Sequence, residues 1–152
     1  MPTDVKSLTR DELEARFKSW EQPVYRVTQL LEWLYVHRVA TWEAMTNLPK
    51  PLREKLGRDF SLQTLELVRK QGARDTTQKF LWRLHDHLLI ESVLIPANPA
   101  SRDCGSDASD RRTLCVSTQV GCAYGCKFCA SGLDGLKRNL TPDEIVEQVL
   151  AV

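Results

Sequence analysis

Three cysteines lie close together in the segment GCAYGCKFCASG, residues 121–132. Cys122, Cys126 and Cys129 are separated by three residues in the first gap and two in the second. A structural zinc site needs four ligands, but no histidine lies near this loop and Cys115 is poorly spaced to complete the set. Three thiolates suit a cubane iron–sulfur cluster with one iron left open to a substrate or cofactor. The spacing therefore favours a cluster, with zinc and unligated cysteines as the alternatives.

The composition of the chain limits the classes of protein to which it can belong. Its 152 residues suggest one domain, or a small domain with part of another. A formal net charge of +1 argues against a strongly basic nucleic-acid binder and leaves room for a local basic patch. The polar start is not expected to be a signal peptide, and no apolar run reaches the ~18 residues of a membrane helix. We therefore expect a cytoplasmic protein whose five cysteines stay reduced.

Residues 1–60 are expected to form a small helical domain. Thr9 and Glu12 have the spacing of a capping box at the start of a first helix. Pro23 is expected to open a second helix. The remaining expectations are a third helix from Thr41 to Pro49, a fourth from Pro51, and inward-facing Val27, Leu30, Leu31, Leu34, Leu52 and Leu56.

The period of the apolar pattern then changes to two, which predicts strands. Strands are expected over residues 64–71, 77–84, 88–96 and 111–119. The second and third should be joined by a tight turn at Asp86–His87, where glycine would fit better than the histidine.

A helix is expected directly after the cysteine loop. Thr141 is the predicted N-cap, with Pro142 in the first turn and Glu144 as the capping-box partner. Its predicted buried stripe consists of Ile145, Val146, Val149 and Leu150. One strand, loop and helix make a single β–α unit, and a parallel sheet needs more of them. We therefore expect the chain to be the N-terminal part of a longer protein.

The cysteine spacing, with an aromatic residue before the last cysteine, resembles the signature of the radical S-adenosylmethionine (SAM) enzymes. RRTLCVSTQVGCAYGCKFCASGLDGLKRNLTPDEIVEQV resembles the RNA adenine methyltransferases of the RlmN–Cfr family, and KFLWRLHDHLLIESVLIP resembles the strand pair that precedes that segment. YRVTQLLEWLYVHRVATWEAMTNLPKPLREKL resembles their N-terminal accessory domain. The resemblance implies a mixed α/β fold (α+β or α/β). A helical RNA-binding accessory domain at 1–60 would precede the start of a truncated, partial (β/α) radical SAM barrel at 61–152.

The same resemblance implies roles for individual residues. Cys122, Cys126 and Cys129 would hold a [4Fe-4S] cluster that binds SAM and cleaves it to a radical. Phe128 would pack beside the cluster and the adenine of SAM. Cys115 stands where the family has a cysteine that resolves a protein–RNA thioether, by forming a disulfide with a methyl-carrying cysteine beyond this chain.

Glu91 lies at the place of the family's proton-accepting glutamate, in IESVLIP. It alternates with Leu89, Val93 and Ile95, so we expect it to be buried, where a carboxylate is costly unless it is paired or functional. The alternative is a glutamate that faces water or an arginine. Without the resemblance, Cys115 would be read as a small buried hydrophobic residue. Two departures from the family are His87 in place of a glycine and a longer polar loop at 97–110 that contains Cys104.

The implied activity is methylation of carbon 2 of adenine in ribosomal RNA and in transfer RNA. The expected partners are those RNAs and an electron donor such as flavodoxin, with the protein acting as a monomer away from membranes. The alternatives are methylation of carbon 8 of the same base, or a non-catalytic RNA-binding or zinc-binding module. The chain alone is expected to be inactive, because it lacks the carrier cysteine.

Overall fold

The computed structural model describes residues 2–73, 76–96, 112–124, 126–127 and 132–152. Phe128, Cys129 and Cys104 lie outside the described residues. The chain forms two compact units, the first made of residues 1–64 with 141–146 and the second of residues 65–140 with 147–152. Among the described residues, no helix is long and apolar enough to cross a membrane.

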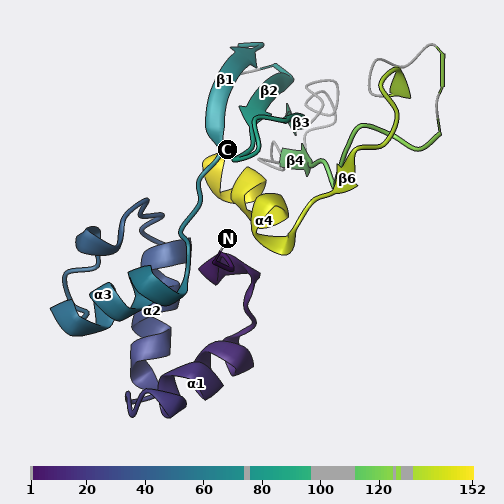
Figure 1. Ribbon diagram of the computed structural model, residues 1–152. Helices are drawn as coiled ribbons and strands as arrows, with labels where there is room; N and C mark the ends of the chain where they lie inside the picture. Colours follow the sequence, from purple (N-terminus) through teal and green to yellow (C-terminus); the bar gives the residue numbers. More distant parts are fainter. Residues whose placement is uncertain (1, 74–75, 97–111, 125, 128–131) are drawn as a thin grey trace. The chain divides into compact units, whose positions relative to one another are not determined.

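The first unit begins with a series of short helices (Figure 1). They are η1 (Val5–Ser7), α1 (Arg10–Ser19), α2 (Tyr25–Tyr35), η2 (Trp42–Ala44) and α3 (Lys50–Asp59). The predicted capping box is confirmed, since the Thr9 hydroxyl accepts from the Glu12 backbone N–H and the Glu12 carboxylate accepts from the Thr9 backbone N–H. Pro51 lies in the first turn of α3, as predicted.

Two of the predicted helix boundaries are wrong. Helix α2 begins at Tyr25 rather than at Pro23, whose carbonyl accepts from the Arg26 backbone N–H at 3.0 Å. The third helix is only the single 3₁₀ turn η2, and the Thr41 side chain makes no capping hydrogen bond there.

The core of the first unit lies between these helices. Leu31 is only partly buried, whereas the other residues predicted to face inward are buried. The buried core residues are Val5, Leu13, Phe17, Val27, Leu30, Leu34, Met45, Leu48, Leu52, Leu56 and Phe60.

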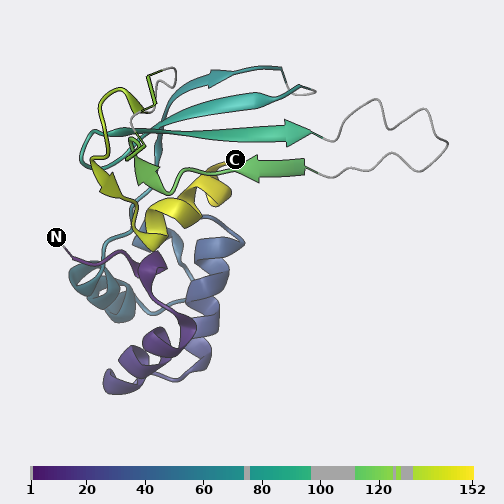
Figure 2. The ribbon, with the colours of Figure 1, turned by 90° about the vertical axis from the view of Figure 1, so that its right-hand side faces the viewer.

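The second unit contains a four-stranded antiparallel sheet in the order β1-β2-β3-β4 (Figure 2). Its strands are β1 (Glu66–Gln71), β2 (Gln78–Arg83), β3 (Leu89–Pro96) and β4 (Arg112–Cys115). Each strand therefore pairs with its neighbours in the sequence.

The predicted turn between β2 and β3 is present. The Leu84 backbone N–H donates to the Leu88 carbonyl at 2.9 Å, and the His87 N–H donates to the Leu84 carbonyl at 3.0 Å. His87 has a φ of 65°, which is the left-handed conformation that a glycine adopts without strain.

One face of the sheet is covered and the other is open. The covered face carries Phe80 and Trp82, whose rings stack 5.5 Å apart, together with Ile90 and Ser92. The C-terminal end of α4 (Pro142–Ala151) lies on this face, since Gln148 hydrogen bonds to Ser92.

Helix α4 starts as predicted but buries a different face. The Glu144 carboxylate accepts from the Thr141 backbone N–H at 3.0 Å, as in a capping box. The predicted buried stripe is wrong, because Val149 is 54% exposed whereas Glu147 and Gln148 are buried. The hydrogen bonds of Gln148 explain the orientation, since they direct a polar position of the helix toward the sheet.

Candidate active site

Two residues singled out from the sequence share the open face of the sheet. Cys115 on β4 pairs with Val93 on β3, and paired residues point to the same side of a sheet. Glu91 lies two positions before Val93 on β3, so it also points to that side. Glu91 and Cys115 are therefore diagonal neighbours on one face, at a typical Cα separation of roughly 7–8 Å.

The expectation that Glu91 is buried is wrong. Its side chain is 46% exposed, and its neighbours along the same face, Leu89 and Ile95, are 47% and 42% exposed. The period of two was correct, but the face that α4 covers is the one with Ile90 and Ser92. Apolar residues on both faces of a strand hide which face is covered.

A lysine partner, which the sequence reading missed, satisfies the Glu91 carboxylate. Lys79 Nζ lies 2.6 Å from Glu91 Oε1. Lys79 pairs with Val93 across β2 and β3, so it is the diagonal neighbour of Glu91 on the opposite side from Cys115. The ion pair with Lys79 holds the Glu91 carboxylate in a fixed position on the open face. The sequence does contain a sign of this lysine. Lys79 directly precedes Phe80, the first of the alternating apolar residues of β2, so it points to the opposite face from Phe80.

The Cys115 thiol is exposed and free. The reading of this residue as a small buried hydrophobic side chain is therefore wrong. A thiol that reacts must be accessible to its partner, and Cys115 meets that condition on the open face.

The cysteine loop leaves the sheet unit through a narrow two-stranded neck that the sequence did not predict. Strands β5 (Gln119–Val120) and β6 (Arg138–Asn139) pair antiparallel. The Leu140 N–H donates to the Thr118 carbonyl and the Lys137 N–H donates to the Val120 carbonyl, each at 2.9 Å. The loop that carries the cysteines is thus closed at its base (Figure 1).

Two glycines allow the neck to close. Gly121 has a φ of 76°, and a Cβ at this position would lie 1.9 Å from the Gly135 carbonyl oxygen. Gly135 also has a positive φ, of 68°, and its carbonyl accepts from the Cys122 backbone N–H at 3.3 Å. Only glycine permits the approach at residue 121. The presence of one glycine on each side of the loop is the sequence signal for this neck.

The described cysteines of the loop fit thiolate ligation. Cys122 and Cys126 are free thiols, neither buried nor fully exposed, and Cys122 follows the neck directly. Within the described part of the chain, no three metal-binding side chains come together. Cys129, the third expected ligand, and Phe128 lie outside that part. Free thiols are the type of donor that an iron–sulfur cluster requires, and Cys122 and Cys126 supply two of them.

An ion pair ties the neck to the turn between β2 and β3. Arg138 Nε and Nη2 both lie 2.8 Å from Asp86 Oδ2. Partial burial raises the pKa of Asp86, but the hydrogen bond from Arg138, the Leu88 backbone N–H and the nearby positive charges outweigh it and lower the pKa overall. The Arg138 guanidinium is therefore engaged in an ion pair with Asp86 within the protein.

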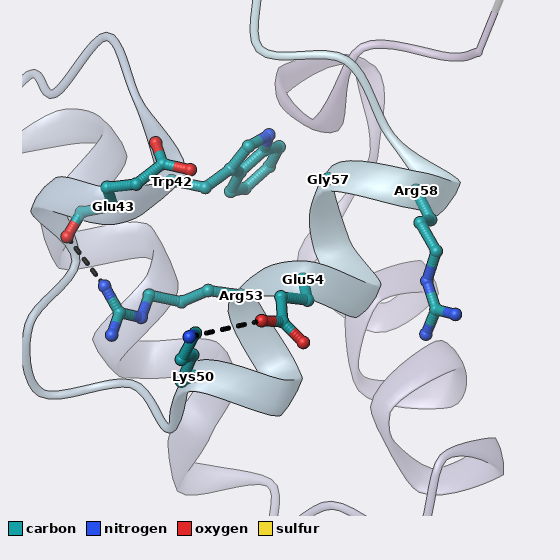
Figure 3. A pocket seen from close by; sticks show the side chains of 7 residues that line it. All are labelled: Trp42, Glu43, Lys50, Arg53, Glu54, Gly57 and Arg58. Atoms are coloured by element: carbon teal, nitrogen blue, oxygen red, sulfur yellow. Dashed lines mark hydrogen bonds and ion pairs between the residues drawn. The ribbon is translucent and has the colours of Figure 1, made fainter.

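The helical unit has a separate cavity of about 600 Å³ beside Trp42 (Figure 3). Gly57 leaves room for the indole, because a Cβ there would lie 3.2 Å from Trp42 Cδ1. Lys50, Arg53 and Arg58 supply positive charge and Glu43 and Glu54 negative charge to its lining. Arg53 donates to the Glu43 carbonyl at 2.7 Å, and Lys50 and Glu54 lie 3.9 Å apart. An aromatic ring with cations at its edge can contact a base and a phosphate.

Comparison with known proteins decides the family. Residues 3–62 match the family described as "Ribosomal RNA large subunit methyltransferase N-terminal domain". A protein of Akkermansia muciniphila, named "Probable dual-specificity RNA methyltransferase RlmN", is 46% identical over 147 residues. That alignment covers 97% of this chain and 40% of the relative. The chain belongs to the RlmN family. The resemblance found in the sequence is thereby confirmed.

Other RlmN relatives match over a similar extent. "Probable dual-specificity RNA methyltransferase RlmN 3" of Opitutus terrae is 49% identical, over 95% of this chain and 38% of the relative. A solved structure titled as a radical SAM methyltransferase from Sphaerobacter thermophilus is 42% identical, with a TM-score of 0.79, over 99% of this chain and 41% of that chain. The chain thus spans about two fifths of the length of these three proteins. Its mixed fold of helices followed by antiparallel strands is similar to the matched part of that radical SAM methyltransferase.

Proposed function

We propose that the chain supplies the accessory domain, residues 1–60, and the start of a partial radical SAM barrel, residues 61–152, of an RNA methyltransferase. The reaction is methylation of carbon 2 of adenine in ribosomal and transfer RNA. The observation that carries the proposal is the shared open face of Glu91 on β3 and Cys115 on β4, because β4 leads into the neck of the cysteine loop. The names of the RlmN relatives support RNA as the substrate.

The cysteine loop is the proposed cofactor site. Cys122, Cys126 and Cys129 would hold a [4Fe-4S] cluster, and Phe128 would pack beside it. When bound there, the cluster and SAM supply the radical chemistry at the substrate. The protein contributes a closed neck, which fixes the loop against the sheet that carries Cys115 and Glu91.

Cys115 is the proposed resolving thiol. Its thiolate attacks the sulfur of a carrier cysteine in the remainder of the parent protein, and a disulfide bond forms. The carbon–sulfur bond between carrier and base breaks, its electron pair stays on the carbon, and that carbon takes up a proton to become the methyl group. An exposed thiol on an open face suits this attack.

Glu91 is the proposed base that removes the proton from the target carbon. Its carboxylate is half-exposed, so a substrate can reach it, and Lys79 Nζ orients it from 2.6 Å.

The helical unit is proposed to contact the RNA, with Trp42 and the cations Lys50, Arg53 and Arg58 as the contact surface. We further propose that the protein works as a monomer in the cytoplasm, with an electron donor such as flavodoxin.

Anaerobic reconstitution tests the cofactor site. We expect bound iron and acid-labile sulfide, lost when Cys122, Cys126 or Cys129 is changed to Ala and retained in Cys104→Ala. Stoichiometric zinc without iron or sulfide would instead support a zinc-binding module.

Nucleoside analysis of RNA treated with the full-length parent and SAM tests the reaction. We expect 2-methyladenosine, whereas 8-methyladenosine would assign the protein to the other branch of the RlmN–Cfr family. Methyl transfer by residues 1–152 alone would contradict the mechanism, because the carrier cysteine would be missing.

A further inference from the structure

A buried glutamine on α4 connects separate segments of the sheet unit. The Gln148 side chain is fully buried. Its Oε1 accepts from the Ser92 hydroxyl and from the Ser117 backbone N–H, each at 2.8 Å. Its amide N–H donates to the Ser117 carbonyl at 2.9 Å. Trp82 Nε1–H donates in turn to the Ser92 hydroxyl at 3.1 Å, so the acceptor side of the amide is anchored in the core.

Ser117 lies between the two parts of the candidate active site. It follows Cys115 by two residues and precedes Thr118, whose carbonyl accepts the first hydrogen bond of the neck. Its own hydroxyl donates to the Glu91 carbonyl at 2.7 Å. Ser117 is therefore fixed by the α4 amide on one side and by the β3 backbone on the other, at the point where the chain leaves β4 for the cysteine loop.

The chemistry of the amide suits this task. A carboxamide offers an acceptor and a donor in one plane, so it can pair with the N–H and C=O of a single residue as a neighbouring strand would. An apolar side chain of the same size would fill the same space, but it would leave both Ser117 backbone groups without these partners. The buried Gln148 amide therefore fixes the position of the Ser117 backbone, which an apolar side chain could not do.

We propose that Gln148 is a positioning residue, which fixes the Cys115 thiol relative to the neck of the cysteine loop by holding the Ser117 backbone. The inference rests on the proposed function, because it concerns the thiol that attacks the carrier sulfur. Such an attack tolerates little displacement, and an error of 1 Å can reduce a rate by roughly a hundredfold. Gln148 acts on Cys115 through the Ser117 backbone.

The structural test compares two variants of the full-length protein. Gln148→Met removes both bonds to Ser117, whereas Ser92→Ala damages the same buried network and leaves those bonds in place. Hydrogen exchange of the peptide that contains Ser117 should be faster by at least about tenfold in Gln148→Met and unchanged in Ser92→Ala. Equal protection of Ser117 in Gln148→Met and the wild type would overturn the proposal.

The functional test uses the same two variants with RNA and SAM. In Gln148→Met we expect release of methylated RNA to slow by about tenfold or more, with accumulation of covalent protein–RNA adduct, while SAM cleavage changes by less than about twofold. Ser92→Ala should release RNA at nearly the wild-type rate. Similar release by both variants would overturn the proposal.

A second variant covers the case in which Gln148→Met does not fold. Gln148→Asn keeps the carboxamide but is one methylene shorter, so it cannot reach the Ser117 backbone as Gln148 does, and we expect accumulation of the same adduct. A folded Gln148→Asn enzyme without any accumulation would overturn the inference in that case. Wild-type protein that cleaves SAM but shows no release dependent on Cys115 would overturn the proposed function, and this inference with it. Normal release in Gln148→Met beside an active wild type would overturn this inference alone.

Discussion

Replacing Gly121 by alanine should open the neck of the cysteine loop. The new Cβ would lie 1.9 Å from the Gly135 carbonyl oxygen, and real Cβ atoms essentially never approach within 3.0 Å, so the two backbones must separate by at least 1.1 Å. That movement breaks the bond from the Cys122 N–H to the same oxygen, which is 3.3 Å long at present. We therefore expect Gly121→Ala to lose the fixed position of Cys122.

The magnitude has two parts. An L-residue in the left-handed conformation costs about 1–2 kcal/mol, and a lost hydrogen bond about 1 kcal/mol more. Gly121→Ala should therefore lower the free energy of unfolding by about 2–3 kcal/mol or more. Gly135→Ala is a matched control, because it has a similar φ of 68° but no atom within 4 Å of the added Cβ. It should carry only the conformational cost, about 1–2 kcal/mol.

The assay is urea denaturation of each variant, followed by anaerobic reconstitution with measurement of iron and sulfide. Gly121→Ala should bind much less cluster than Gly135→Ala at equal protein concentration. Gly72→Ala adds a control away from the cysteines, since its Cβ would lie 2.1 Å from the Thr77 carbonyl oxygen. It should destabilise the sheet and keep the cluster. Equal loading of Gly121→Ala and Gly135→Ala would refute the role given to the neck.

Three further predictions concern the open face and the turn. Cys115→Ala in the full-length protein should still cleave SAM, but the reaction should stop at a covalent protein–RNA adduct. A denaturing gel should show this adduct as a nuclease-sensitive band. Release of methylated RNA at the normal rate would show that Cys115 is only a packing residue. Glu91→Gln should slow removal of the target proton by roughly a hundredfold or more, and Lys79→Met should have a smaller effect in single-turnover kinetics; equal effects would contradict the separate roles. Because the pKa of Asp86 is lowered in the folded protein, its pairing with Arg138 should stabilise the fold above the ordinary pKa of about 4 and be lost as the pH falls through the lower folded value. Urea midpoints between about pH 2 and 6 should show this loss in the wild type and not in Asp86→Asn.

Features that depend on a few neighbouring residues could be predicted from the sequence. The box of Thr9 and Glu12 and the left-handed turn at His87 are examples, because their hydrogen bonds join residues only a few positions apart. The cysteine spacing and the surrounding motifs were sufficient to indicate the RlmN family.

Features that depend on distant contacts could not be predicted. The buried face of α4 follows from hydrogen bonds between Gln148 and residues as far away as Ser92, 56 positions earlier. The exposure of Glu91 has the same origin, because β3 carries apolar residues on both faces and only the helix decides which face is covered. The neck at β5 and β6 rests on a close approach of Gly121 to Gly135, which no local periodicity reveals.

The distance along the chain between Gln148 and its partners also bears on the order of folding. Each strand of the sheet pairs with the next strand in the sequence, and such local pairings form early. During synthesis, Cys122 and Cys126 emerge before Gln148, since a chain is made from its N-terminus. The sheet and the neck can therefore assemble before Gln148 forms its hydrogen bonds to the Ser117 backbone. On this sequence of events, the thiols of the proposed cluster site are available in the nascent chain before α4 docks on the sheet.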